Sequence, residues 1–138
     1  MEYKPTSGSA IEFAQTGQLE EWIQNFLRGE GNNLGFADGL KLAPRIYHAP
    51  KNIPLSKFSR VCGPEEGLKW QIDENGFNWR VGKIMERYEN EGWDMPPLII
   101  NCQDGIYELN DGNHRFEALS RLGIKNHWVV FWETIHEE

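Results

Sequence analysis

The chain has 138 residues, which suits one domain of ordinary size and leaves little room for two independent cores. Hydrophobic residues make up 39% of the sequence and charged residues 25%, a profile typical of a globular rather than a disordered protein. With 14 Lys and Arg against 21 Asp and Glu, the formal net charge is −7. This balance disfavours non-specific binding to nucleic acid, because such affinity comes from Lys and Arg side chains that face phosphates.

The sequence contains no pattern typical of a membrane-spanning or targeting segment. The longest apolar runs, residues 98–100 and 128–132, are far too short to cross a bilayer, and residues 1–10 lack the apolar stretch of a secretory signal. Cys62 and Cys102 do not form a disulfide framework, and no spacing typical of a zinc site accompanies them. We therefore expect a reduced, cytoplasmic protein with no membrane partner.

The N-terminal half begins with helical patterning and continues with weak patterning. An apolar stripe from Leu19 to Leu27 follows the spacing of an amphipathic helix that Gly29 ends, and the capping pattern of residues 9–12 predicts a short helical turn before it. Residues 31–67 are rich in Gly, Pro and Asn and are expected to be mostly loop. Within this stretch we expect only a strand near 45–48 and a short extended segment at 53–55.

The C-terminal half is better patterned. A second helix is predicted with Asp73 or Asn75 as its N-cap and Gly92 as its C-cap. It is followed by a strand at 98–101, a hairpin turn at 103–105 and a returning strand at 106–110. A third helix at 113–122 and a final apolar strand at 126–133 come next. We predict an α/β (α+β) fold: a single small domain over 45–138, with a mixed sheet and flanking helices, and an N-terminal helical and loop extension over 1–44.

The point where the returning strand meets the third helix concentrates residues suited to phosphate chemistry. A helix N-terminus offers unpaired N–H groups and a partial positive charge, and Gly112 lets an anion approach the backbone closely. Arg115 has a planar set of donors that matches phosphate oxygens, and His114 adds a donor whose charge depends on pH. Asp111 can orient Arg115, hold Mg²⁺ against a phosphate or accept a proton.

The run from Asp111 to Ala118, with residues 97–109 before it and Leu122-Gly123 after it, resembles the ParB/sulfiredoxin-like superfamily. The resemblance covers about residues 53–132 and extends more loosely to Arg60 and the residues before it. It implies a stand-alone ParB-like domain in which a nucleotide phosphate binds at Gly112, Asn113, His114 and Arg115, with Arg60 as a further phosphate ligand. Trp70 and Trp93 flank loops and can line such a pocket.

The sequence departs from the members of this superfamily in informative ways. Glu117 stands where the ParB loop has its last arginine, which removes one phosphate contact, and Asn113 stands where sulfiredoxins have their nucleophilic cysteine. Asp111, Gly112 and Arg115 match the pattern of the free-serine kinases, which supports phosphoryl transfer. The second catalytic acid of those kinases lies in an earlier loop, where Glu65 and Glu66 are both candidates.

These observations lead to one preferred hypothesis and one alternative. The chain is expected to bind a nucleotide or another phosphate-bearing ligand and, if it is an enzyme, to act as a Mg²⁺-dependent phosphotransferase, nucleoside triphosphatase or nuclease. Asp111, His114 and Arg115 would then be the catalytic residues, and Asp111 would also be the metal ligand. The alternative is a non-catalytic module for DNA or protein interaction, in which residues 111–115 only cap a helix.

Overall fold

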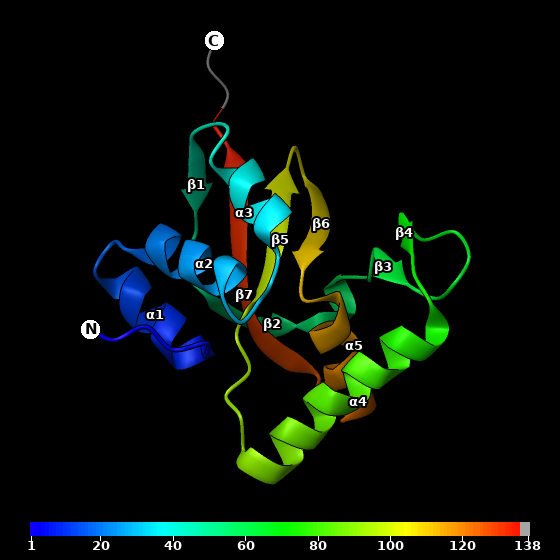
Figure 1. The fold of residues 1–138 in the computed structure, drawn as a ribbon. Helices are drawn as coiled ribbons and strands as arrows, with labels where there is room; N and C mark the ends of the chain where they lie inside the picture. Colours follow the sequence, from blue (N-terminus) through cyan, green and yellow to red (C-terminus); the bar gives the residue numbers. More distant parts are fainter. Residues whose placement is uncertain (136–138) are drawn as a thin grey trace.

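The computed structural model describes residues 1–135. A mixed five-stranded sheet forms its centre, in the order β1 (Arg45–Tyr47), β7 (Asn126–Thr134), β5 (Leu98–Gln103) and β6 (Ile106–Asp111), while β2 (Lys51–Pro54) also pairs with β7 (Figure 1). Strands β5 and β7 run parallel, and the other pairs are antiparallel. The predicted α+β class and mixed sheet are thus confirmed.

Alternation along the two central strands divides the core between the two faces of the sheet. Ile99 and Val130 belong to the cluster on one face, whereas Leu98, Ile100 and Val129 belong to the cluster on the other. This arrangement follows from the period of two in β-strands, which sends successive side chains to opposite faces. Because both faces are covered, each of these strands contains a continuous apolar run, at 98–100 and 128–132.

Three helices cover the first face: α1 (Ser7–Gln15), α2 (Leu19–Arg28) and α3 (Leu34–Leu40), as Figure 1 shows. Trp22 of α2 is fully buried and its ring stacks on Phe26 with 5.1 Å between the ring centroids. These helices share their hydrophobic cluster with β5 and β7. The segment expected to be an N-terminal extension therefore supplies one layer of the core.

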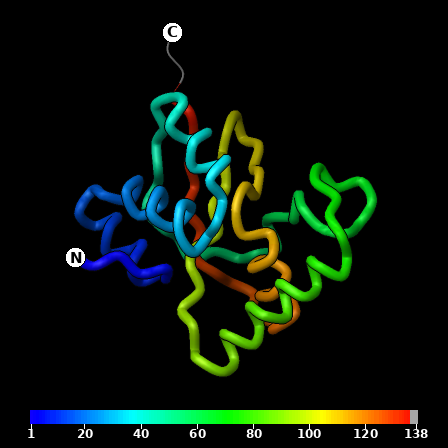
Figure 2. Tube along the Cα trace, viewed as in Figure 1, coloured from blue at the N-terminus to red at the C-terminus, as the bar shows by residue number. Residues whose placement is uncertain are grey.

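The second face is covered by α5 (Asn113–Arg121) and the short 3-10 helix η1 (Leu55–Lys57). Outside them, α4 (Glu74–Glu91) packs on α5 through Phe77, Val81 and Ala118. The Cα trace shows α4 running alongside α5 and the chain then returning to the sheet (Figure 2). This packing places the N-terminal half of α4 next to the first turn of α5, where Phe77 lies beside His114.

Most predicted elements are confirmed, including the Asp73 and Gly92 caps of α4, but the loop expected over 31–67 is partly wrong. Helix α3 lies within it, capped by the Asn33 side chain, and β3 (Cys62–Gly63) forms a short parallel pair with β4 (Trp70–Gln71). In addition, the predicted turn at 9–12 is part of a longer helix whose N-cap is Thr6. Short elements of two to seven residues carry little periodicity, because their conformation depends on tertiary contacts.

Candidate functional site

The junction between β6 and α5, which we call the switch (residues 111–115), is shaped by Gly112. Its φ of +106° lies in the left-handed region, which side chains rarely adopt. A Cβ atom at this position would lie 2.6 Å from Leu98 Cδ2 and 3.0 Å from Arg115 Nη2. A glycine is therefore required both for the turn and for the close approach of the Arg115 guanidinium to the backbone.

Helix α5 begins at this turn with unpaired backbone donors. The first N–H group of the helix to find a backbone acceptor is that of Phe116, which donates to Gly112 O at 2.7 Å. Among the described residues no side chain caps the helix, so the three preceding N–H groups, of residues 113–115, keep their donor capacity. The switch therefore does have the free amides that an anion site needs.

Arg115 and Asp111 form a buried pair below the turn. Arg115 is 8% exposed, and its Nη2 donates to Pro97 O at 2.9 Å and to Asp111 Oδ2 at 3.3 Å. The other carboxylate oxygen, Oδ1, accepts from Asn33 Nδ2 at 3.1 Å. Burial lowers the pKa of Arg115, and the Asp111 carboxylate opposes that shift. Among the described residues Arg115 Nε has no hydrogen-bond partner.

The Asn113 side chain lines the Trp70 side of the switch and is held by hydrogen bonds to the neighbouring loop. Its Oδ1 accepts from the N–H groups of Val61 and Cys62 at 2.9 and 3.2 Å, and its Nδ2 donates to Leu109 O at 3.3 Å. This buried amide ties α5 to β3 and β6. Of the predicted phosphate contacts of Asn113, only the backbone N–H is available.

Arg60 lies outside the residues that line the groove over the switch, and its predicted role as a phosphate ligand stays a prediction. Its guanidinium pairs with Glu65, the nearer contact being 2.6 Å, and its Nε donates to Glu117 at 3.2 Å. The guanidinium also lies over the Phe77 ring, 4.8 Å from the centroid. Glu117, which replaces the family arginine, is thus the acidic partner of Arg60 and of Arg121. Of the two candidate catalytic acids, Glu65 has its carboxylate engaged by the Arg60 guanidinium.

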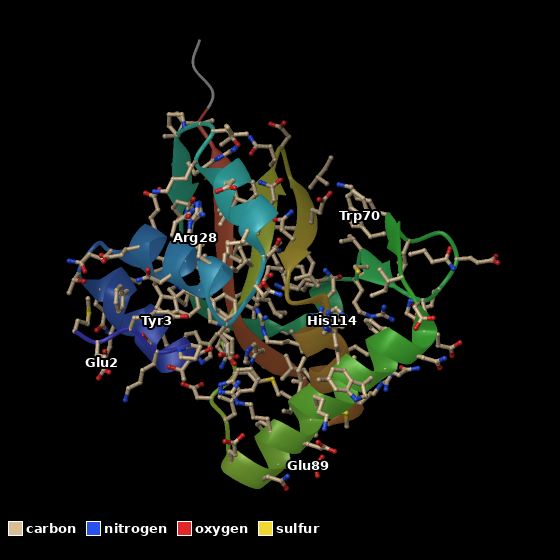
Figure 3. The ribbon with its side chains drawn as sticks, in the orientation of Figure 1. Glu2, Tyr3, Arg28, Trp70, Glu89 and His114 are labelled. Carbon is tan, nitrogen blue, oxygen red and sulfur yellow. The ribbon has the colours of Figure 1, made fainter. Side chains whose placement is uncertain are left out.

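His114 is half-buried beside Phe77, with 5.0 Å between the two rings, at the position marked in Figure 3. Burial lowers the pKa of His114, and the nearby Arg80 and Arg115 lower it further. The imidazole is therefore neutral at pH 7. Its Nε2 is buried and, among the described residues, has no hydrogen-bond partner. A polar atom in that state is uncommon in a folded protein and is a candidate for a ligand contact.

A groove passes over the switch and extends in two directions. One side, which we call the α4 arm, has a volume of about 340 Å³ and runs along Trp79, Arg80, Lys83 and Arg87 to Trp93. The other, the Trp70 arm, has a volume of about 510 Å³ and lies between residues 31–33 and 61–70. Asp111, Gly112 and His114 line both arms. The predicted position of Trp70 and Trp93 at a pocket is confirmed.

Arg80, which is not among the predicted site residues, lines both arms. Its side chain is exposed, and within residues 1–135 it makes no hydrogen bond or ion pair. A signal for it was present in the sequence, because Arg80, Lys83 and Arg87 recur at the i, i+3 and i+7 spacing of one helix face.

The residues present do not fit a resident Mg²⁺ ion at Asp111. Both carboxylate oxygens already accept hydrogen bonds, one of them from a guanidinium. In the part of the chain that is described, no three His, Cys, Asp or Glu side chains come together in a metal-binding cluster. Since Mg²⁺ needs carboxylate or phosphate oxygens around it, Asp111 fits the first of its three predicted roles, the orientation of Arg115.

Comparison with known proteins gives distant relatives. The chain is 26% identical to the UPF0257 lipoprotein YnfC of Salmonella typhi and of Salmonella typhimurium, over 76% of this chain and 54% of those proteins. It thus spans about half the length of the curated relatives it matches. No protein-family profile matches the chain. Among solved structures, a Pnob8-like ParB-N domain is similar with a TM-score of 0.43 and 15% identity, over 68% of this chain and 32% of that one.

The compartment of the chain stays a prediction. The Salmonella relatives are named as lipoproteins, whereas the sequence favours a cytoplasmic protein. From residue 1 to residue 135, the helices are all too short or too polar to cross a membrane.

Proposed function

We propose that the switch binds the phosphate group of a nucleotide or another phosphate-bearing ligand. The observation that carries this proposal is the unpaired guanidinium of Arg80 beside the uncapped N-terminus of α5, in a groove that both of them line. Backbone N–H groups at a helix N-terminus, where the helix dipole favours negative charge, bind phosphate in many proteins. A free guanidinium adds charge-assisted hydrogen bonds to the phosphate oxygens.

The structural roles of the residues in the switch support ligand binding more than catalytic turnover. Asp111 and Arg115 form the buried pair below the turn, Asn113 fixes the adjacent loop, and Gly112 and His114 line the groove. The carboxylate of Glu108 in the Trp70 arm is engaged by Lys69 at 2.9 Å. The neutral His114 imidazole is then the group best placed to accept a proton if the ligand is turned over.

The alternative, in which residues 111–115 only cap a helix, has less support. Neither the Asp111 nor the Asn113 side chain accepts a hydrogen bond from the N–H groups of the first turn of α5, because the oxygens of each accept from other donors. A capping role would place at least one of these side chains on the N–H groups of that turn.

Binding is tested by calorimetry and thermal unfolding with ATP, ADP, CTP, GTP and inorganic phosphate. A ligand that binds only the folded state must raise its melting temperature. We expect Arg80→Ala to weaken binding about tenfold, the contribution of one charge-assisted hydrogen bond. The matched control is Arg28→Ala, which removes the same charge from α2 outside the groove. Absence of binding by every compound, or equal effects of the two substitutions, would overturn the proposal.

A further inference from the structure

The two arms of the groove differ in charge. Four cationic and two carboxylate side chains line the α4 arm, whereas two of each line the Trp70 arm. On a chain with a net charge of −7, a surface with excess cations is a local exception. The excess comes from α4, on the side of the switch away from Trp70.

The cations of the α4 arm lie in a row that leads away from the switch. Arg80, Lys83 and Arg87 occupy one face of α4 at the i, i+3 and i+7 positions. With a rise of 1.5 Å per residue, the row extends for about 10 Å along the helix axis. One phosphate group cannot contact all three side chains at once, but a chain of linked phosphates can.

These cations are available to a ligand. Arg80 has no ion pair among the described residues, and Lys83 has one contact to Glu86, at 3.5 Å between two exposed side chains. Arg87 pairs with Glu30 and Glu91 while its guanidinium stacks over Trp93, 3.9 Å from the ring centroid. Exposed ion pairs contribute little free energy, so a polyanion can replace these carboxylates at small cost.

The buried end of this row shows the same excess of positive charge. Arg115 is 8% exposed and lines the α4 arm, with an Nε that has no partner within residues 1–135. Burial lowers the pKa of His114 most, and Arg80, Arg115 and Arg60 lower it further, against the opposing effect of Asp111. An anion in the arm would relieve this imbalance.

We propose that Arg80, Lys83 and Arg87 form a polyphosphate subsite, which selects ligands that carry two or more linked phosphates over those that carry one. This inference rests on the proposed function, because the first phosphate is held by the amides of the switch. Lys83 and Arg87 are then specificity-determining residues that contact only the later phosphates, whereas Arg80 contacts the first.

The subsite is tested by calorimetry of the full chain with inorganic phosphate, pyrophosphate and tripolyphosphate, in the presence of a chelator. We expect affinity to rise on the order of tenfold for each added phosphate, since each gains a charge-assisted hydrogen bond. Lys83→Ala should reduce the affinity for tripolyphosphate about tenfold and leave that for phosphate unchanged. Arg80→Ala should weaken all three.

The control is Lys69→Ala, which removes the same charge from the Trp70 arm, where Lys69 pairs with Glu108. It should leave the ratio of the tripolyphosphate and phosphate affinities unchanged. Equal affinity for the three anions, or the same ratio in Lys83→Ala as in the unsubstituted protein, would overturn the subsite while leaving the phosphate site intact. If none of the three anions binds, the proposed function itself is wrong.

Discussion

Two arginines on the packed helices α4 and α5 line the same groove but differ in burial and in ion pairing. Arg115 at the start of α5 is buried and paired, while Arg80 on α4 is exposed and has no partner among the described residues. The first belongs to the recognisable motif and the second does not. The comparison indicates that the motif builds the turn and its free amides, while the exposed charge that a ligand can contact comes from the helix packed beside it.

The comparison is tested most strongly by removal of the buried arginine. Arg115→Met should lower the free energy of unfolding by about 3–5 kcal/mol, because it leaves the Asp111 carboxylate buried without its cationic partner. Chemical denaturation measures this loss. Asp111→Asn combined with Arg115→Met should recover part of it, since the uncompensated charge is then absent. If Arg115→Met alone has no effect, the pair does not stabilise the turn.

The next largest effect is expected at the turn itself. Gly112→Ala should destabilise the fold by about 2 kcal/mol or more, since it adds left-handed strain and a contact 2.6 Å from Leu98. Gly105→Ala is the matched control: its φ is +77°, but a Cβ there meets no atom within 4 Å, so only about 1 kcal/mol is expected. Equal losses in the two variants would show that close packing at Gly112 is unimportant.

The sequence predicted the backbone of this region better than it predicted its charges. The strand, turn and helix around Gly112 follow from local patterns, because an apolar strand and a glycine before an amphipathic helix each have few alternatives. Arg60 donates to Glu117 and Arg115 donates to Pro97 O, and both partners are distant in sequence, so local patterns do not predict these contacts. For the same reason α3 and Arg80 were missed, since both acquire their role only through packing.

The state of His114 gives a smaller, pH-dependent effect. Burial, Arg80 and Arg115 lower the pKa of His114 in the folded state. As pH falls, the histidine of the unfolded chain, with a pKa of about 6.5, is therefore protonated at a higher pH than His114 of the folded chain. The stability that neutral His114 contributes is therefore complete above that pH and is lost as pH falls through the folded pKa. His127, also buried with a lowered pKa, acts in the same direction.

The contribution of His114 to the pH dependence is measured from the free energy of unfolding at pH 7.5 and at pH 5.5. We expect His114→Gln to reduce the fall in stability between the two pH values, because a group that gains a proton more readily in the unfolded chain is then absent. A slope that is the same in His114→Gln as in the unsubstituted protein would show that the imidazole is not held neutral by its surroundings.

The smallest effect on stability is expected at Arg80, the exposed arginine of the pair. Arg80→Ala should change the free energy of unfolding by no more than about 0.5 kcal/mol, because the exposed side chain has no described hydrogen bond or ion pair to lose. Chemical denaturation of this variant beside Arg115→Met therefore measures the contrast directly. A cation retained for folding would cost stability when removed, and one retained for a ligand would not. If Arg80→Ala destabilises the protein as much as Arg115→Met does, the two arginines serve the same structural purpose, and the groove loses the free charge on which its phosphate site depends.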